Sequence, residues 1–314
     1  MRILVGYDGS KHSIAALEEL ERAGLPGDTD ALVVSVGDLL AEGPAVQEAV
    51  AAAMPSHNVS MSLLRAQNHA ERVNSQSAEV ADEAAERLRS KFPGWNVEAR
   101  VLSGTPEWEL IDAARDWKAD LIVVGSQGRS AIGRLLIGSV SKKVVTDSDT
   151  SVRVVRSVER KKDGAPPRIL IGVDGSPAAA EAVREVGRRA WPERTEVRLV
   201  AVHDRPSLAS IGARLPRAAG MIDDVNQKLA ARTDEMIEWA TQELKTIGLN
   251  VSISIQRGDP KRILLREARN WNAECIFVGT RDLKSGLDRL RLGSVSTAIV
   301  TNAPCTVEVV RPAA

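Results

Sequence analysis

The sequence predicts an α/β fold made of two tandem domains, each with a parallel sheet covered by helices on both faces. Three observations lead to this prediction. One sequence pattern occurs twice, short apolar runs alternate with helical patterns in each copy, and glycines join a late apolar run to a helix in each copy. Alternation of nearly continuous apolar strands with helices is typical of parallel sheets buried on both sides.

The duplication is visible in several matching segments. RILVGYDGS at 2–10 recurs as RILIGVDGS at 168–176. The long segment at 96–125, which ends in DLIVVG, recurs at 250–279, which ends in ECIFVG. A repeat of about 150 residues is far longer than a solenoid unit and has the size of a whole domain.

The repeat boundaries give the expected domain organisation. Domain 1 is expected at 1–158, a charged linker with Pro and Gly at 159–167, and domain 2 at 168–314. The stretch Gly37–Ser77 is longer than a normal crossover, so we interpret it as an insertion. We expect a helix at Ala49–Met54 and loop in the rest of it.

Each half is expected to be Rossmann-like, with five strands. In the first half the expected strands are Arg2–Asp8, Ala31–Val36, Asn96–Leu102, Asp120–Gly125 and Val152–Arg156. The expected helices are Ser10–Ala23, Ala78–Lys91, Pro106–Trp117 and Ser139–Thr146. Ligands of such sheets lie at the carboxyl ends of the strands. Asp8 and Gly125, which end the first and fourth strands, therefore indicate one crevice.

The glycine motif of the first half predicts a phosphate site. Gly125 and Gly128 follow a buried strand, and Gly138 and Ser139 precede a helix. Glycines there allow backbone N–H groups to approach an anion, and Ser139 and Ser141 add hydroxyl donors where the helix dipole favours negative charge. The motif is neither a Walker A loop nor the dinucleotide fingerprint. The alternative is that these glycines serve turns only.

Composition excludes several classes of function. Lys plus Arg and Asp plus Glu both number 42, so no global basic field favours nucleic acid. No apolar run approaches the ~20 residues of a membrane span, and the chain opens on a strand instead of a signal peptide. The two cysteines, Cys275 and Cys305, lie in or beside apolar runs and are expected to be buried thiols. We expect a cytoplasmic protein.

These motifs together resemble the universal stress protein family over nearly the whole chain. The residues that carry the resemblance are Asp8–Ser10 and its copy Asp174–Ser176, the turn Gly104–Pro106 and its copy Gly258–Pro260, and the glycine loop Gly125–Ser139. The resemblance implies a five-stranded parallel sheet in the order 3-2-1-4-5. It also implies ATP binding for members with the full glycine motif, often with Mg²⁺ on the phosphates.

The resemblance further implies a role for individual residues. Asp8 would contact the adenosine, and the backbone of Val36 would pair with the adenine edge. The phosphates would be held by Gly125, Gly128, Gly138, Ser139, Val140 and Ser141. Arg129 is expected to offset phosphate charge, with a surface role as the alternative. For Asp8 the alternative is a helix cap or turn-former.

The second half departs from the motif. Asp282 stands where Gly128 stood, and its spacing to Gly293 is one residue longer. A carboxylate there repels a triphosphate unless a cation intervenes. The counterparts that persist are Asp174, Val202, Gly279, Gly293, Ser294 and Ser296. We therefore predict that the first domain is the better ATP site, and that the second binds in an altered way or is empty.

The leading hypothesis is an ATP-binding regulator of the stress response. No metal-ligand spacing of histidines and no nucleophile elbow indicates dedicated catalysis, so no catalytic residue is predicted. The alternatives are a slow ATPase or nucleotidyl-transfer enzyme, and a nucleotide-free scaffold. The last strands, Ser151–Arg156 and Thr306–Arg311, are expected to pair into a pseudo-dimer within the chain, as the resemblance implies. Whether two chains form a homodimer stays open.

Overall fold

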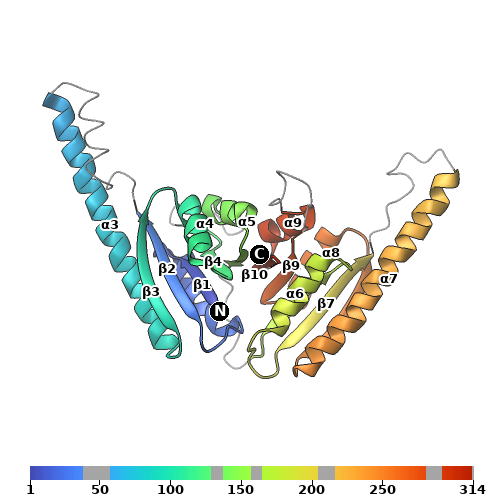
Figure 1. Ribbon diagram of the computed structural model, residues 1–314. Helices are drawn as coiled ribbons and strands as arrows, with labels where there is room; N and C mark the ends of the chain where they lie inside the picture. Colours follow the sequence, from blue (N-terminus) through green and yellow to red (C-terminus); the bar gives the residue numbers. More distant parts are fainter. Residues whose placement is uncertain (38–56, 129–136, 157–164, 204–215, 281–291, 313–314) are drawn as a thin grey trace.

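The computed structural model describes residues 1–37, 57–128, 137–156, 165–203, 216–280 and 292–312. A single ten-stranded sheet runs through the molecule in the order β3-β2-β1-β4-β5-β10-β9-β6-β7-β8 (Figure 1). The strands are β1 (Arg2–Gly6), β2 (Asp30–Gly37), β3 (Asn96–Ser103), β4 (Leu121–Gly125), β5 (Ser151–Val155), β6 (Arg168–Val173), β7 (Glu196–His203), β8 (Asn250–Arg257), β9 (Cys275–Gly279) and β10 (Thr306–Val310). Each half has the order 3-2-1-4-5, so the expected fold is confirmed.

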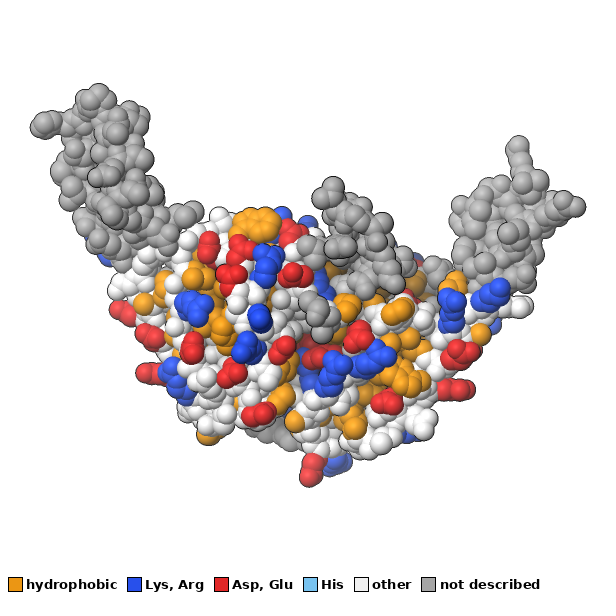
Figure 2. All heavy atoms as spheres, in the orientation of Figure 1, with side chains coloured by type: hydrophobic (Ala, Val, Ile, Leu, Met, Phe, Trp, Pro, Cys, Tyr) orange, Lys and Arg blue, Asp and Glu red, His pale blue; other side chains and the backbone are white. Residues whose placement is uncertain are grey.

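Helices connect the consecutive parallel strands within each half. They are α1 (Lys11–Glu19), the 3₁₀ turn η1 (Leu20–Arg22), α3 (His57–Lys91), α4 (Pro106–Trp117), α5 (Ser139–Asp147), α6 (Pro177–Gly187), α7 (Pro216–Thr246), α8 (Pro260–Asn270) and α9 (Ser294–Asn302). None of the described helices combines the length and apolar character needed to cross a bilayer. On the face shown in Figure 2, acidic and basic side chains are interspersed over the described surface, as the balanced charge implies.

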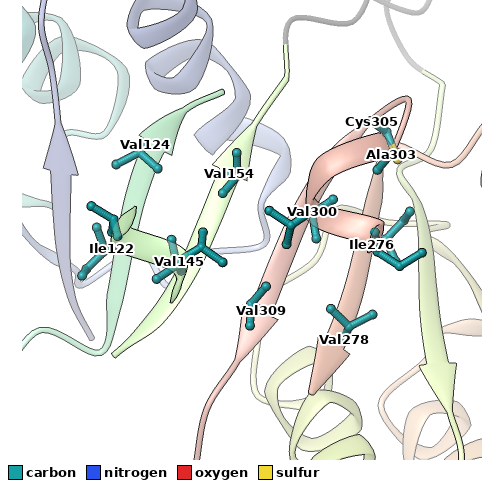
Figure 3. Close-up of a cluster of buried hydrophobic side chains, with 14 of the residues drawn as sticks. Ile122, Val124, Val145, Val154, Ile276, Val278, Val300, Ala303, Cys305 and Val309 are labelled. Atoms are coloured by element: carbon teal, nitrogen blue, oxygen red, sulfur yellow. The ribbon is translucent and has the colours of Figure 1, made fainter. Parts of the chain in front are cut away.

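Side-chain alternation along the strands divides the core into layers. In β1, Ile3 and Val5 pack with α1 and α3, whereas Leu4 packs on the opposite face with α4 and α5. On the α4 and α5 face, one apolar cluster continues across both halves through Val154 and Val309 (Figure 3). The opposite face has a separate cluster in each half. The shared cluster therefore joins the two halves into one body.

The stretch Gly37–Ser77 differs from the prediction. We expected mostly loop, but His57–Ser77 is helical and forms the first part of α3, so that prediction was wrong. The long helix α7 occupies the corresponding place in the second half, and both helices extend past the sheet at the outer ends of the molecule (Figure 1). The expected helix at Ala49–Met54 lies outside the described residues, as does linker segment 157–164.

The two halves meet through their last strands, as predicted. β5 and β10 are antiparallel, with Arg153 opposite Glu308, whereas the other strand neighbours are parallel. Both side chains are fully buried, and Arg153 Nη1 donates to Glu308 Oε2 at 2.6 Å. Arg153 Nε also donates to Glu19 at 2.8 Å, and Arg189 donates to the other oxygen of Glu308. The charges at this junction are thus paired within the protein.

Two equivalent arginines fasten each half to the other. Arg156 Nη2 donates to the carbonyl oxygen of Val300 in α9 at 2.6 Å, and Arg311 Nη2 donates to that of Val145 in α5 at 2.6 Å. Carbonyl groups near a helix C-terminus lack intrahelical donors, so a cation there satisfies them. Burial lowers the pKa of Arg311 to about 10. These hydrogen bonds attach the C-terminal ends of α5 and α9 to the opposite half. The N-terminal ends of the two helices follow the glycine loops.

Candidate functional site

The first strand of each half ends in a turn built by an aspartate. Asp8 Oδ1 accepts a hydrogen bond from the backbone N–H of Ser10 at 3.0 Å, and Asp174 does the same with Ser176 at 3.0 Å. Ser10 in turn caps α1, because its hydroxyl oxygen accepts from the N–H of Ser13 at 3.2 Å. Asp8 is therefore a turn-former whose neighbour supplies the cap. This local role holds the carboxylate at the crevice and is compatible with a ligand contact.

Close backbone approach explains the first glycine of each motif. A Cβ at Gly125 would lie 2.7 Å from the carbonyl carbon of His12, and a Cβ at Gly279 would lie 2.2 Å from the carbonyl oxygen of Ala178. At Gly128, a Cβ would lie 3.1 Å from Asp8 Oδ2. The structure thus brings Gly128 next to Asp8, as expected from their places at adjacent strand ends.

The helices that follow the glycine loops have glycine at the N-cap position. Gly138 is the N-cap of α5 and Gly293 is the N-cap of α9, and among the described residues neither helix has a side-chain cap. By contrast, α1, α6 and α8 have Ser or Asp caps. The first N–H groups of a helix need an acceptor from outside it. Both helices therefore present donors and a positive dipole end suited to an anion.

The serines of these helices divide into two kinds. Ser141 is buried and donates to the carbonyl oxygen of Gly125 at 2.6 Å, and Ser296 donates to that of Gly279 at 3.0 Å. Their hydroxyl protons tie the helix to the preceding strand. Ser139 and Ser294, at the first helical positions, are exposed. Their hydroxyls are the ones placed to meet a ligand.

A cavity of about 940 Å³ lies at the carboxyl ends of the second-half strands. This volume falls within the usual range of small-molecule sites. The residues predicted for the second half all line it, namely Asp174, Val202, Gly279, Gly293, Ser294 and Ser296. The structure therefore gathers the whole predicted set around one space.

The first-half residues occupy the corresponding places in their own sheet. Val36 and Val140 are half-buried and pack against the shared apolar cluster. Gly138 lies beside the loop, because its N–H donates to the carbonyl oxygen of Ser126 at 2.7 Å. Arg129 of the first half and Asp282 of the second lie outside the described residues.

Comparisons with known proteins agree with this geometry. The sequence profile of the universal stress protein family matches residues 1–156 and again 167–311. This chain belongs to the universal stress protein family. A universal stress protein of Mycobacterium tuberculosis is 28% identical over 327 residues, covering 98% of this chain and 94% of that protein. The crystal structure of a universal stress protein from Archaeoglobus fulgidus shares the fold, with a TM-score of 0.61, 21% identity, and coverage of 99% and 98%.

Two further structures of the family contain nucleotides. One is a universal stress protein in complex with cAMP and the other is an Arabidopsis thaliana family protein with AMP bound. Each covers 47% of this chain, with TM-scores of 0.32 and 0.34 respectively.

Sequence reasoning missed several residues of this universal stress protein's site. Arg257, Lys261, Thr233 and His203 line the second-half cavity, and none of them belongs to the motifs. Arg257 ends β8 and Lys261 follows the Gly-Asp-Pro turn. A signal was present, because the residues after strand ends in a parallel sheet face the crevice.

His12 is a further residue that the motifs did not single out. It occupies the position of Ala178, which lines the second-half cavity, 166 residues further on. Within the described part of the chain, its buried Nδ1 has no hydrogen-bond partner. Burial and then the charge of Lys11 lower the pKa of His12, against a smaller opposite effect of Asp8. The lowered pKa favours the neutral imidazole, and the backbone of His12 lies next to Gly125.

The acidic residues do not gather into a metal site of their own. Across the described residues there is no group of three or more His, Cys, Asp or Glu side chains that could hold a metal. Magnesium is usually bound through one or two carboxylates together with substrate phosphates. Asp8 and Asp174, the aspartates that follow the first strand of each half, fit this arrangement of a carboxylate together with phosphates. Cys275 and Cys305 are buried free thiols, and burial raises the pKa of Cys275 well above its ordinary value.

Proposed function

We propose that the protein is an ATP-binding regulator of the stress response that holds one nucleotide in each half. One observation carries the proposal. The residues predicted for the second half line one cavity, and helix α9, which begins at its edge, has no side-chain cap among the described residues. The matching uncapped helix α5 and the Asp8–Gly128 contact support an equivalent site in the first half. We keep the first half as the tighter ATP site, because of Asp282 in the second.

The phosphates are proposed to lie at the first turns of α5 and α9. There the ligand receives backbone N–H donors and the exposed hydroxyl of Ser139 or Ser294. Buried Ser141 and Ser296 hold the turn in place through their bonds to Gly125 and Gly279. The adenosine is proposed to lie toward Asp8 and the end of β2 at Val36. Mg²⁺ would accompany the phosphates, with Asp8 or Asp174 as the available carboxylate.

We infer a regulatory role from the groups that line the proposed site. Within the described crevice residues we find a cradle for an anion, but we assign no group as a general base. Binding can signal energy state only if ATP favours one conformation of the protein over another. We propose that the glycine loop is the element that ATP biases, and that the protein acts in the cytoplasm.

Paired substitutions at the two helix caps test nucleotide binding. Gly138→Asp and Gly293→Asp place a carboxylate where the phosphate would lie. Asp is a favoured N-cap, and both glycines have extended backbone angles that Asp accepts, so each helix keeps or gains stability. Among the described residues, a Cβ at Gly293 would have no neighbour within 4 Å, and at Gly138 its nearest neighbour is 3.4 Å away. Both substitutions should therefore leave the fold intact, so that a loss of nucleotide binding would reflect a change at the ligand site.

Isothermal titration calorimetry with MgATP gives the readout. We expect two unequal sites in the unmodified chain, loss of the tighter site in Gly138→Asp, and loss of the weaker site in Gly293→Asp. Gly138→Ala and Gly293→Ala are the matched neutral controls, expected to retain measurable binding. Absence of any binding in the unmodified chain would refute the proposal, as would binding unaffected by both Asp substitutions.

A further inference from the structure

We call Arg257, Lys261 and His203 the second-half rim, and their counterparts Ser103, Glu107 and Gly37 the first-half rim. The two rims have opposite hydrogen-bonding character, and this inference rests on the proposed nucleotide function. We propose that the second-half cavity selects a guanine nucleotide, whereas the first-half crevice selects an adenine nucleotide. The difference lies in Arg257 and Lys261, which stand where the first half has Ser103 and Glu107.

The equivalence of these positions follows from the fold as well as from the repeat. Arg257 is the last residue of β8 and pairs with His203, while Ser103 is the last residue of β3 and pairs with Gly37. Lys261 and Glu107 are both the second residue of their helices, after Pro260 and Pro106. The substitutions therefore occupy the same places on the two rims.

The second-half rim is rich in donors that are available to a ligand. Arg257, Lys261 and His203 line the cavity. Within the described part of the chain, neither Arg257 nor Lys261 makes an ion pair. Asp259 also lines the cavity, but its Oδ1 accepts from the backbone N–H of Lys261 at 3.0 Å, which leaves the ammonium group of Lys261 uninvolved. His203 Nε2 lies 3.9 Å from Asp234 Oδ1.

The first-half rim has acceptors in the same places. Glu107 offers only carboxylate oxygens at neutral pH. No side chain stands at Gly37, and Asn74 fills the space instead, with its Nδ2 donating to Ser103 Oγ at 3.3 Å. The hydroxyl of Ser103 is thus engaged by a neighbour. The first rim has the carboxylate of Glu107, whereas the second has the cations of Arg257 and Lys261, with Asp234 and Asp259 also in the cavity lining.

The rim lies where a base would lie if the phosphates are at α9. The strand order β9-β6-β7-β8 puts two strands between β9 and Arg257 on β8. At about 4.8 Å per strand, this separates the phosphate end from the rim by roughly 10–15 Å. One cavity is lined continuously from Ser294 at α9 to Arg257. A nucleotide with its phosphates at α9 therefore extends its base toward Arg257 and Lys261.

The two purines differ in what they present to such a rim. Guanine offers two acceptors, O6 and N7, to which Arg or Lys is the usual partner, whereas adenine offers the N6 amine as a donor beside N7. Donors of Arg257 and Lys261 match O6 and oppose the amine of adenine. Glu107 accepts from that amine and repels O6. ATP and GTP carry the same triphosphate, so this preference is separate from the attraction of phosphate to Arg257 and Lys261.

Full-length chains with one site blocked test the selectivity. Gly138→Asp leaves the second-half site, and Gly293→Asp leaves the first-half site. Calorimetric titration with MgGTP and MgATP should show about tenfold or greater preference for GTP in Gly138→Asp, and for ATP in Gly293→Asp, since one good base contact discriminates by roughly that factor or more. Adding Arg257→Ser and Lys261→Glu to Gly138→Asp should reverse the preference.

The outcomes separate this inference from the proposed function. If neither nucleotide binds either half, the proposed function fails. If both halves bind with the same GTP-to-ATP ratio, or if the rim substitutions weaken both nucleotides equally, nucleotide binding stands and the selectivity is overturned. Arg257 is exposed and Lys261 half-exposed, so the substituted chain should keep its unfolding temperature, which circular dichroism would check.

Discussion

The two halves of the chain share a sheet order but differ in charge at two places. At the junction the first half supplies Arg153 and the second half supplies Glu308 at equivalent positions. These two residues face each other at the centre of the pseudo-symmetric strand pair, where two identical halves would place like charges together. At the crevice rims the second half has Arg257 and Lys261 where the first half has Ser103 and Glu107. Because the two halves belong to one chain, their sequences could diverge. The junction now has opposite charges facing each other, and the two crevices have different residues.

Removing Glu308 should have the largest effect on stability. Glu308→Ala leaves Arg153 and Arg189 buried with fewer partners. Breaking a buried ion pair from one side typically costs about 3–5 kcal/mol of the free energy of unfolding. Guanidinium denaturation followed by circular dichroism would measure the loss. In the half-exposed pair of Arg168 and Glu196, Glu196→Ala is the control and should cost less than about 1 kcal/mol. Equal effects would contradict a specific junction.

The first glycine of each motif should tolerate no side chain. Gly125→Ala and Gly279→Ala force a Cβ against the backbone of α1 and α6, and overpacking of this kind typically costs about 1–3 kcal/mol. Gly293→Ala meets none of the described residues within 4 Å and should stay within about 0.5 kcal/mol of the unmodified chain. Thermal unfolding of the three variants makes the comparison. A neutral result at Gly279 would show that the backbone approach at 2.2 Å relaxes freely.

The sequence predicted the sheet better than it predicted the contacts between distant segments. Continuous apolar runs such as Leu121–Val124 indicate a buried strand by themselves, and the repeat gives the rest by analogy. The helix over His57–Ser77 was missed although Val59, Leu63, Ala66, Ala70 and Val73 recur at helical spacing, because the whole stretch from Gly37 was interpreted as one insertion. The pairing of Arg153 with Glu308 was not predictable, because it depends on the register of β5 against β10. The rim residues Arg257 and Lys261 belong to no motif, and their place near the end of a strand was the one sequence signal before the cavity showed them together.

The smallest expected effect is on the pH dependence of stability. His12 is titratable, whereas its counterpart Ala178 is not. Because burial lowers the pKa of His12 below 6.5, the unfolded chain binds a proton at a higher pH than the folded chain does. The free energy of unfolding should therefore fall as the pH drops from about 7.5 through the ordinary histidine pKa toward the lowered one. In His12→Ala this part of the slope should disappear. Urea denaturation at several pH values, with identical slopes for both proteins, would contradict the lowered pKa.

Calorimetric titration of the unmodified full-length chain with MgATP alone tests the inequality of the two halves most directly. The charge differences at the rims and at Asp282 predict two sites per chain with clearly different dissociation constants, the tighter one removed by Gly138→Asp. Two sites of equal affinity per chain would contradict it.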